Sequence, residues 1–244
     1  MCFGYAAMQG KIFCEPQIGD KRKKTEGVLS MTKSNLSLAD KAYEVLEEMI
    51  VTLKLPPGKV FSESEISDAI EIGRTPMREA LQRLAADRLV TTIPRKGVMV
   101  TDVNIAEHLA LLETRRVLER LLATKAARRS RPEHSEELRN CASAMQKAAE
   151  EVRISDFMRL DREFDDIIAR AARNVFAAKA AEPLRAHCRR FWYLYQANRD
   201  LTRSAGVHVD LMMAIADKNE EKAGACSDLL MDYLDEFTRS ALDL

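Results

Sequence analysis

Asp161 and Asp165 are two carboxylates at a spacing that suits a shared cation or a basic partner. They lie four residues apart, beside Phe164 and Ile168, so a helix would place both carboxylates on one partly apolar face. Two carboxylates on such a face need a cation or a basic partner between them, because their like charges otherwise repel each other. The spacing therefore predicts either a cation site or a pairing with a basic side chain.

Arg115 and His208 are also expected on apolar helix faces. A buried guanidinium is costly unless it is paired, so Arg115 needs either an internal carboxylate, the more common solution, or a bound anion. His208 shares a face with Met212 and Ile215, where a lone histidine is more often a core residue than a ligand. The apolar residues in helical register with Arg115 are Leu111, Leu118 and Leu122.

One stretch of the chain is basic although the formal net charge is zero. Between residues 74 and 96, only Glu79 and Asp87 oppose six basic side chains. Such an excess can bind phosphates, although it is also common on solvated faces. The six residues are Arg74, Arg78, Arg83, Arg88, Arg95 and Lys96.

The elements around this basic stretch have the order of a winged helix-turn-helix. Apolar periodicity predicts a helix over 39–53, and Ser62 with Glu65 makes a capping box for a second helix. A third helix is expected from about Thr75-Pro76, because proline is tolerated in a first turn. Strands are expected over 89–93 and 98–100. The prediction is three helices plus a two-stranded wing over residues 37–102. The first helix would bury Val45, Leu46, Met49, Ile50 and Leu53, and the second Ile66, Ala69 and Ile70.

The start of the third helix carries the residue types that read DNA. The first residues of a recognition helix reach deepest into the major groove, and here they are Arg74, Thr75 and Arg78. Arginine can grip guanine O6 and N7, and Thr75 can contact a phosphate or a thymine methyl group. The turn between the strands ends in Lys96-Gly97, which is short enough to enter a minor groove or follow the backbone.

The chain after Asn104 is predicted to be entirely helical. The fold class is therefore mainly α, with the winged helix-turn-helix followed by an all-α bundle of six to seven helices over 103–244. Residues 1–36 lack periodicity and are expected to form a flexible tail, and Met31 within it is a candidate for the native start. The expected bundle helices are 105–129, 133–152, 154–172, 174–198, 202–217 and 219–242.

Composition narrows the setting in which the protein works. Apolar residues make up 46% of the chain, enough for a sizeable core, yet no apolar run approaches the roughly 18 residues that span a bilayer. The five cysteines are widely spaced, which is typical of free thiols in a reducing compartment. We therefore expect a cytoplasmic protein without a membrane partner.

Several segments resemble the signature of GntR-family winged-helix regulators of bacteria. The resemblance implies that Arg74, Thr75, Arg78 and Gly97 contact operator DNA, with Lys96 beside them at the wing. Ser64 stands where some relatives carry a base-reading arginine, so that contact is absent here. The matching segments are Pro57-Gly58, Ser62 to Ile66, Gly73 to Leu81 and Pro94 to Gly97.

The helical half resembles the FadR-type ligand-binding domain, also called FCD. The resemblance implies an anion pocket that would use Arg115, Asp161 and His208, above a divalent metal (Zn, Ni or Mn) held by one Asp and three His. Here Asp165 replaces one histidine, and Leu230 stands at the fourth ligand position. The candidate metal ligands are thus Asp161, Asp165 and His208. The matching residues are Glu113, Arg115, Leu118-Glu119, Asp161 to Phe164, Asn174, His208 and Ala214-Ile215.

These features together predict a ligand-responsive transcription regulator rather than an enzyme. We expect a homodimer on an inverted-repeat operator, acting as a repressor that a small organic acid releases. One alternative is a metal-dependent enzyme, which hydrolytic turnover that follows added metal would support. Another is an effector-independent architectural DNA binder, for which Arg115→Ala would leave DNA binding unaltered with every metabolite.

Overall fold

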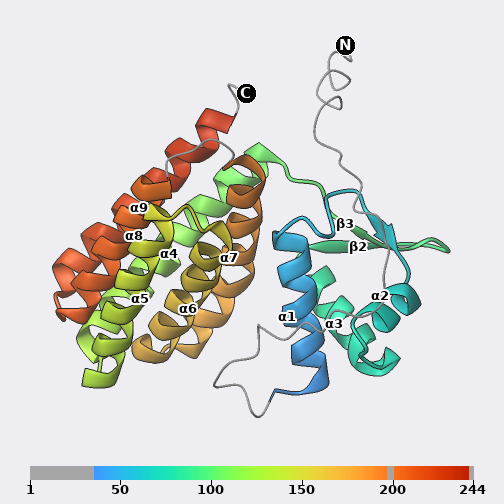
Figure 1. Cartoon of the computed structure of the whole chain (residues 1–244), viewed down its shortest axis with the longest axis horizontal. Coiled ribbons are helices and arrows are strands. Elements are labelled where there is room, and N and C mark those ends of the chain that lie inside the picture. The colour runs from blue at the N-terminus through green and yellow to red at the C-terminus, as the bar shows by residue number, and fades with distance from the viewer. Residues whose placement is uncertain (1–35, 197–200, 242–244) are drawn as a thin grey trace. The chain divides into compact units, whose positions relative to one another are not determined.

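The computed structural model of the chain describes residues 36–196 and 201–241 (Figure 1). The predicted tail over 1–36 and the proposed start at Met31 lie outside these residues, apart from Leu36. The predicted ends near residues 198 and 242 of two bundle helices also fall outside them.

The head of the molecule, defined here as α1 to β3, begins with helices whose starts are set by local capping. Ser37 with Asp40, and Ser62 with Glu65, each form a complete capping box, which satisfies backbone N–H groups at the helix starts. Gly73 begins the third helix without a side-chain cap. The three helices are α1 (Leu38–Val51), α2 (Glu63–Ala69) and α3 (Arg74–Ala86).

The wing is a three-stranded antiparallel sheet rather than the predicted two-stranded ribbon. Its strands are β1 (Val60–Phe61), β2 (Val90–Ile93) and β3 (Gly97–Val100), in the order β1-β3-β2. The additional strand pairs Val60 with Met99 and Phe61 with Val98. A two-residue strand has too little sequence to show alternation, so periodicity could not reveal it.

The buried faces of α1 and α2 differ from the expected ones. Val45 is 41% exposed, whereas Leu46 and Ile50 are fully buried and Glu47 is buried with them. Ala69 is exposed in α2, where Ile66 and Ser67 are buried instead. The face of α1 includes Glu47 because α1 packs both on α3 and on α7.

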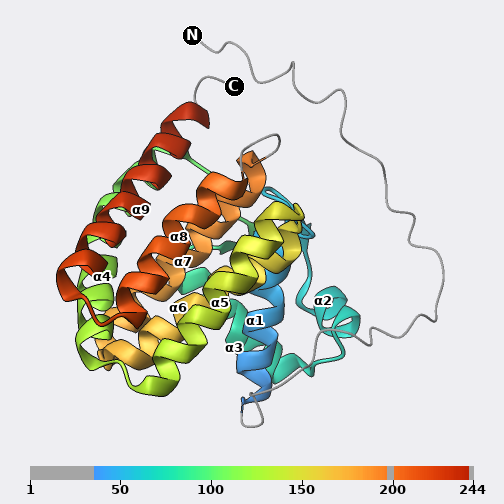
Figure 2. The same ribbon diagram turned by 60° about the vertical axis from the view of Figure 1, so that its left-hand side comes forward.

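The bundle, defined here as α4 to α9, follows the predicted boundaries within a few residues. Figure 2 shows its helices running beside one another, with α4 along α9 and α5 along α8. The described residues thus confirm the mainly α fold and give six bundle helices. They are α4 (Ile105–Arg129), α5 (Pro132–Glu150), α6 (Ile154–Ala172), α7 (Val175–Tyr195), α8 (Leu201–Ala216) and α9 (Glu220–Ser240).

Two hydrophobic cores form, one mostly in the head and one mostly in the bundle. Each core takes in a residue from the other part. Val51 at the end of α1 belongs to the bundle core, and Ala186 of α7 belongs to the head core. Helix α7 is therefore the bundle element that packs most directly on the head.

No helix in the described ranges combines the length and the apolar character that a membrane crossing requires.

Candidate DNA-binding and effector sites

The start of α3 presents the predicted base-reading residues to solvent. Arg74, Thr75 and Arg78 are all exposed, while Met77 and Ala80 on the opposite face are fully buried in the head core. The i, i+4 spacing puts Arg74 and Arg78 on one face of the helix. Their burial pattern leaves these side chains available to a partner outside the molecule.

A groove of roughly 630 Å³ runs between α2, α3 and the wing, and Arg78 lines it. The Arg78 guanidinium lies 3.2 Å from the carboxylate of Glu63 on α2. Lys96, at the wing turn, is exposed at the same groove. The other lining residues are Ser62, Leu81, Gln82, Ala85, Thr92, Ile93, Pro94, Arg95, Gly97 and Val98.

Gly97 has a structural reason for its identity. Its φ is +110°, and a Cβ built there would lie 2.4 Å from the carbonyl oxygen of Phe61 in β1. Only glycine adopts such a φ without strain, and only glycine allows this approach between strands. Gly97, which the sequence pattern associates with DNA, is therefore also required for β1 to pair with β3.

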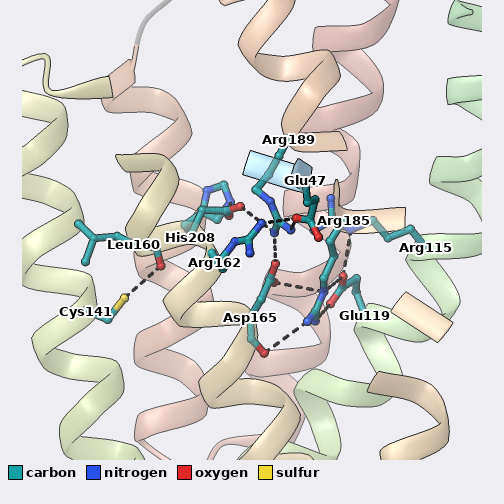
Figure 3. Close-up of polar contacts among 11 residues, drawn as sticks. Glu47, Arg115, Glu119, Cys141, Leu160, Arg162, Asp165, Arg185, Arg189 and His208 are labelled. Carbon is teal, nitrogen blue, oxygen red and sulfur yellow. Dashed lines mark hydrogen bonds and ion pairs between the residues drawn. The ribbon is translucent and has the colours of Figure 1, made fainter. Parts of the chain in front are cut away.

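A cluster of buried charges lies in the bundle, formed by α4, α6, α7 and α8 (Figure 3). Arg115 is 6% exposed, and its Nε donates to Glu119 Oε1 at 2.9 Å. Arg185 grips the same carboxylate with two hydrogen bonds, from Nε at 2.7 Å and from Nη2 at 2.6 Å. The internal carboxylate, one of the two partners expected for Arg115, is thus Glu119, one turn along α4.

Asp165 and Asp161 find their basic partner in Arg189 of α7. Arg189 Nη1 lies 2.7 Å from Asp165 Oδ2 and 3.7 Å from Asp161 Oδ2. Arg185 Nε is also 3.1 Å from Asp165 Oδ1. Of the two predicted outcomes for this carboxylate pair, the structure has the pairing with a basic side chain.

The same arginine reaches into the head. Arg189 Nη2 donates to Glu47 Oε1 of α1 at 3.2 Å, and Arg162 of α6 donates to the same oxygen. Glu47 is 2% exposed. Helix α7 makes two further contacts on this side: His187 Nε2 lies 2.8 Å from the Asp87 carbonyl oxygen in the head, and the Arg190 guanidinium donates to the carbonyl oxygen of Thr101, directly after β3.

Both ring nitrogens of His208 face acceptors. Nδ1 lies 2.7 Å from the Ser204 carbonyl oxygen, and Nε2 lies 3.1 Å from Asp161 Oδ1. Only the doubly protonated ring can donate from both nitrogens. Burial lowers the pKa of His208, but the hydrogen bond and charge of Asp161 outweigh it, so the pKa is raised above its ordinary value.

The carboxylates of the cluster titrate differently from one another. Burial raises the pKa of Asp165 to about 6, despite the nearby charge of Arg185. Burial also acts on Glu119, but Arg185 and Arg115 outweigh it and lower the pKa of Glu119 to about 2. The pKa of Asp161 is likewise held below its ordinary value, by His208 against the effect of burial. Of these three carboxylates, Asp165 is the one that gains a proton most easily.

The arrangement does not fit the divalent metal that the resemblance implies. Arg189 lies at both aspartates, His208 has no lone pair free when both nitrogens donate, and Leu230 at the fourth position is buried in the apolar core. Across residues 36–196 and 201–241, no three His, Cys, Asp or Glu side chains come together as a metal-binding group. The metal prediction is therefore not supported by the side chains as they lie.

Sequence reasoning missed the basic half of this cluster. Arg185 and Arg189 lie four residues apart on α7, close to the buried apolar residues Ala181, Ala186 and Cys188. Two arginines at helical spacing among buried small residues are the same kind of signal that Arg115 gave. Glu47 gave no such signal, because its helix has further charged residues on either side.

The fold and these sites define a class: a winged-helix DNA-binding head joined to an all-helical bundle with a buried charged centre. Residues 38–100 match the family model "Bacterial regulatory proteins, gntR family", and residues 110–233 match the FCD domain. The chain belongs to the GntR family of transcriptional regulators and carries an FCD domain, as FadR-like members do. The members of this family are regulators rather than enzymes. They bind DNA through the winged-helix head and small molecules through the FCD domain.

Curated relatives agree with this assignment. The Nta operon transcriptional regulator of Aminobacter aminovorans is 24% identical over 177 residues, covering 72% of this chain and 83% of the relative. The HTH-type transcriptional repressor RspR of Escherichia coli is 28% identical over 152 residues, covering 62% of this chain and 67% of the relative.

Solved structures show the same fold. The E. coli McbR/YncC structure has a TM-score of 0.75 at 20% identity and covers 85% of this chain and 100% of its own. A putative GntR regulator from Rhodococcus sp. RHA1 has a TM-score of 0.62 at 20% identity, covering 84% and 97%.

Proposed function

We propose that this regulator binds an inverted-repeat operator as a homodimer and that a small organic acid releases it. In this proposal residues 37–102 are the DNA-binding domain and residues 103–244 are the effector-binding and dimerisation domain. The observation that carries it is the exposed start of α3, with Arg74, Thr75 and Arg78 beside the groove at the wing. A protein that reads operators acts in the bacterial cytoplasm.

Each proposed DNA contact has a distinct role. Arg74 and Arg78 present guanidinium groups to base edges, where guanine offers two acceptors in the major groove. Thr75 contacts a phosphate or a thymine methyl group, and Lys96 contacts phosphates at the wing. Gly97 lets the wing backbone approach the duplex because it has no side chain.

Selection from random duplexes tests the DNA-binding half. We expect an enriched inverted repeat, which fluorescence anisotropy would then use as the probe. Arg78→Ala should weaken binding by roughly 1–3 kcal/mol, as for a base-reading arginine. Arg128→Ala, on the surface of the bundle, is the matched control. Equal affinities of the two variants would disprove the assignment of Arg78.

The buried cluster favours an anionic effector. With His208 protonated it holds five cations, Arg115, Arg162, Arg185, Arg189 and His208, against the four carboxylates Glu47, Glu119, Asp161 and Asp165. A carboxylate ligand would balance the remaining positive charge. Among the described contacts Arg115 makes one ion pair, through Nε, so its terminal nitrogens suit a ligand carboxylate.

We propose that this recognition involves Arg115, Asp161 and His208 and needs no divalent metal, because the predicted metal ligands already have protein partners. The effector acts by binding one arrangement of the head more tightly than another. A panel of mono- and dicarboxylates, added to the protein–operator complex, tests this. Arg115→Met should lose the response of the wild type, whereas a wild type that responds to none would favour the architectural DNA binder.

The homodimer would use the exposed face of α4. Val117 is 70% exposed and Leu121 is 37% exposed, and because they lie one helical turn apart they share one face of α4. We expect Val117→Glu to shift the protein towards monomer in light-scattering measurements. Val175→Glu, at an exposed apolar position on α7, is the matched control. A dimer that survives Val117→Glu unchanged would place the interface elsewhere.

A further inference from the structure

Glu47 is a head residue whose carboxylate is buried among bundle side chains. It is 2% exposed, and both cations that pair with it, Arg162 and Arg189, come from the bundle. Removing one partner from a buried pair leaves an uncompensated charge, which is strongly unfavourable. The position of α1 therefore depends on the bundle arginines remaining where they are.

Arg189 is the one cation that contacts both sides of this boundary in the described part of the chain. Its Nη1 lies close to Asp161 and Asp165 in the bundle. Its Nη2 donates to Glu47 in the head, and Figure 3 shows Arg189 between Asp165 and Glu47. Its Nε is buried and has no hydrogen-bond partner. The guanidinium is thus shared among three carboxylates and still has a donor to spare.

We propose that Arg189 serves as the resident cation of this FCD domain in place of a divalent metal, and that it links the effector cluster to the DNA-binding head through Glu47. The first half follows from where the guanidinium lies, beside Asp161 and Asp165, the residues at two of the metal-ligand positions of the family pattern. The second half follows from the hydrogen bond to Glu47. It rests on the proposed function only in naming the cluster as the effector site.

The Arg189 guanidinium differs from a divalent metal ion in properties that matter for this site. A guanidinium stays charged at every physiological pH and cannot be lost to a chelator. Its planar array of donors can hold carboxylates on two sides at once, which suits a link between two parts of a protein. An anion that draws Arg189 towards itself weakens the bond to Glu47, so effector binding and head position become coupled reciprocally.

Metal response tests the first half. The wild-type protein, dialysed against EDTA, should contain no stoichiometric metal and should keep its melting temperature when Zn²⁺, Ni²⁺ or Mn²⁺ is added. Arg189→Met should gain a metal-dependent rise in melting temperature, because Asp161 and Asp165 then lose the cation that they share. Arg189→Lys keeps the charge and should, like the wild type, show no rise in melting temperature when metal is added.

Three outcomes decide this half. An Arg189→Met variant that added metal stabilises, or that folds only with added metal, supports the proposal. A folded variant that ignores all three metals overturns it. If the variant stays unfolded throughout, the wild type decides: a metal-free protein that is insensitive to EDTA supports the proposal, and loss of stability on chelation overturns it.

Hydrogen exchange of the full chain tests the link to the head without any effector. We expect amides of α1 to exchange at least fivefold faster in Glu47→Gln, and no further increase when Arg189→Met is added to it. Glu48→Gln, which removes an exposed carboxylate from the neighbouring position on α1, is the matched control. Failure to find any releasing organic acid would sink the proposed function but leave this result standing. Equal exchange in Glu47→Gln and Glu48→Gln would overturn the link.

Discussion

Arg78 on α3 lies 3.2 Å from Glu63 on α2, so a proposed base-reading side chain already has an anionic neighbour. Both side chains are largely exposed, at 64% and 40%, and an ion pair of this kind contributes little to stability. Arg78 can therefore leave Glu63 for DNA at small cost. The carboxylate would then remain close to the phosphates.

We expect Glu63→Gln to tighten DNA binding because it removes the repulsion between the Glu63 carboxylate and the DNA phosphates. The gain should be on the order of a few-fold at low salt and should shrink as salt screens the charge. Anisotropy titrations at two salt concentrations measure it. Glu133→Gln, in the first turn of α5, controls for the change in net charge. Identical affinities for the two variants would show that Glu63 does not face the duplex.

Gly97→Ala should destabilise the head, although the substitution adds only one methyl group. The residue has φ +110°, and its Cβ would meet the Phe61 carbonyl oxygen at 2.4 Å. Strain of this kind costs on the order of 1–3 kcal/mol. Gly206→Ala in α8 is the matched control, since a Cβ there meets nothing within 4 Å and alanine favours helix by roughly 0.5–1 kcal/mol. Denaturant unfolding that ranks the two variants in the reverse order would contradict this account.

Glu119→Gln should be strongly destabilising, because Arg115 and Arg185 both depend on its carboxylate. All three side chains are at most 7% exposed, so neither arginine can turn to water. Breaking a buried pair costs roughly 3–5 kcal/mol. Asp217→Asn, which breaks an exposed pair with Arg139, should stay close to the wild type in the same unfolding measurement. Similar losses of stability in both variants would show that leaving Arg115 and Arg185 without the Glu119 carboxylate costs no more than breaking an exposed ion pair.

Stability should fall as pH rises through two separate windows. Burial raises the pKa of Asp165 from its ordinary 3.8 to about 6. Protonation of Asp165 therefore stabilises the folded state fully below about pH 4, and this contribution is lost as the pH rises through about 6. The raised pKa of His208 acts in the same direction at higher pH: its contribution is complete below pH 6.5 and is lost as pH rises through the folded pKa. Glu119 and Asp161, whose pKa values are lowered, act in the opposite direction and only at more acidic pH.

Melting temperatures between pH 4 and 8.5 separate these windows. Asp165→Asn should flatten the profile between about pH 4 and 6, while Arg185, Arg189, Glu119 and Asp161 around it keep their charges. His208→Gln should flatten the profile above pH 6.5. Profiles that run parallel to the wild type would refute the assignment of each window to its residue.

Local signals in the sequence determined most of the secondary structure. The capping box of Ser62 and Glu65, and the change from helical to alternating periodicity after Leu84, depend on residues within a few positions of each other. Local signals of this kind predicted α2, α3 and the bundle helices with small errors at their ends. The motif from Gly73 to Leu81 likewise identified the exposed residues of α3, because a recognition helix is a short contiguous segment.

The tertiary structure alone decided which charges meet. Sequence spacing showed that Asp161 and Asp165 need a cation, but Arg189 lies 24 positions after Asp165 and 142 positions after Glu47, distances over which no periodicity operates. The short β1 strand and the choice of Glu47 rather than Val45 for the buried face also depend on distant segments. Helices form from local preferences, whereas the pairing of buried charges is set by which faces pack together and exclude water. For that reason the sequence left both a cation site and a basic side chain open for Asp161 and Asp165, and the fold put Arg189 there.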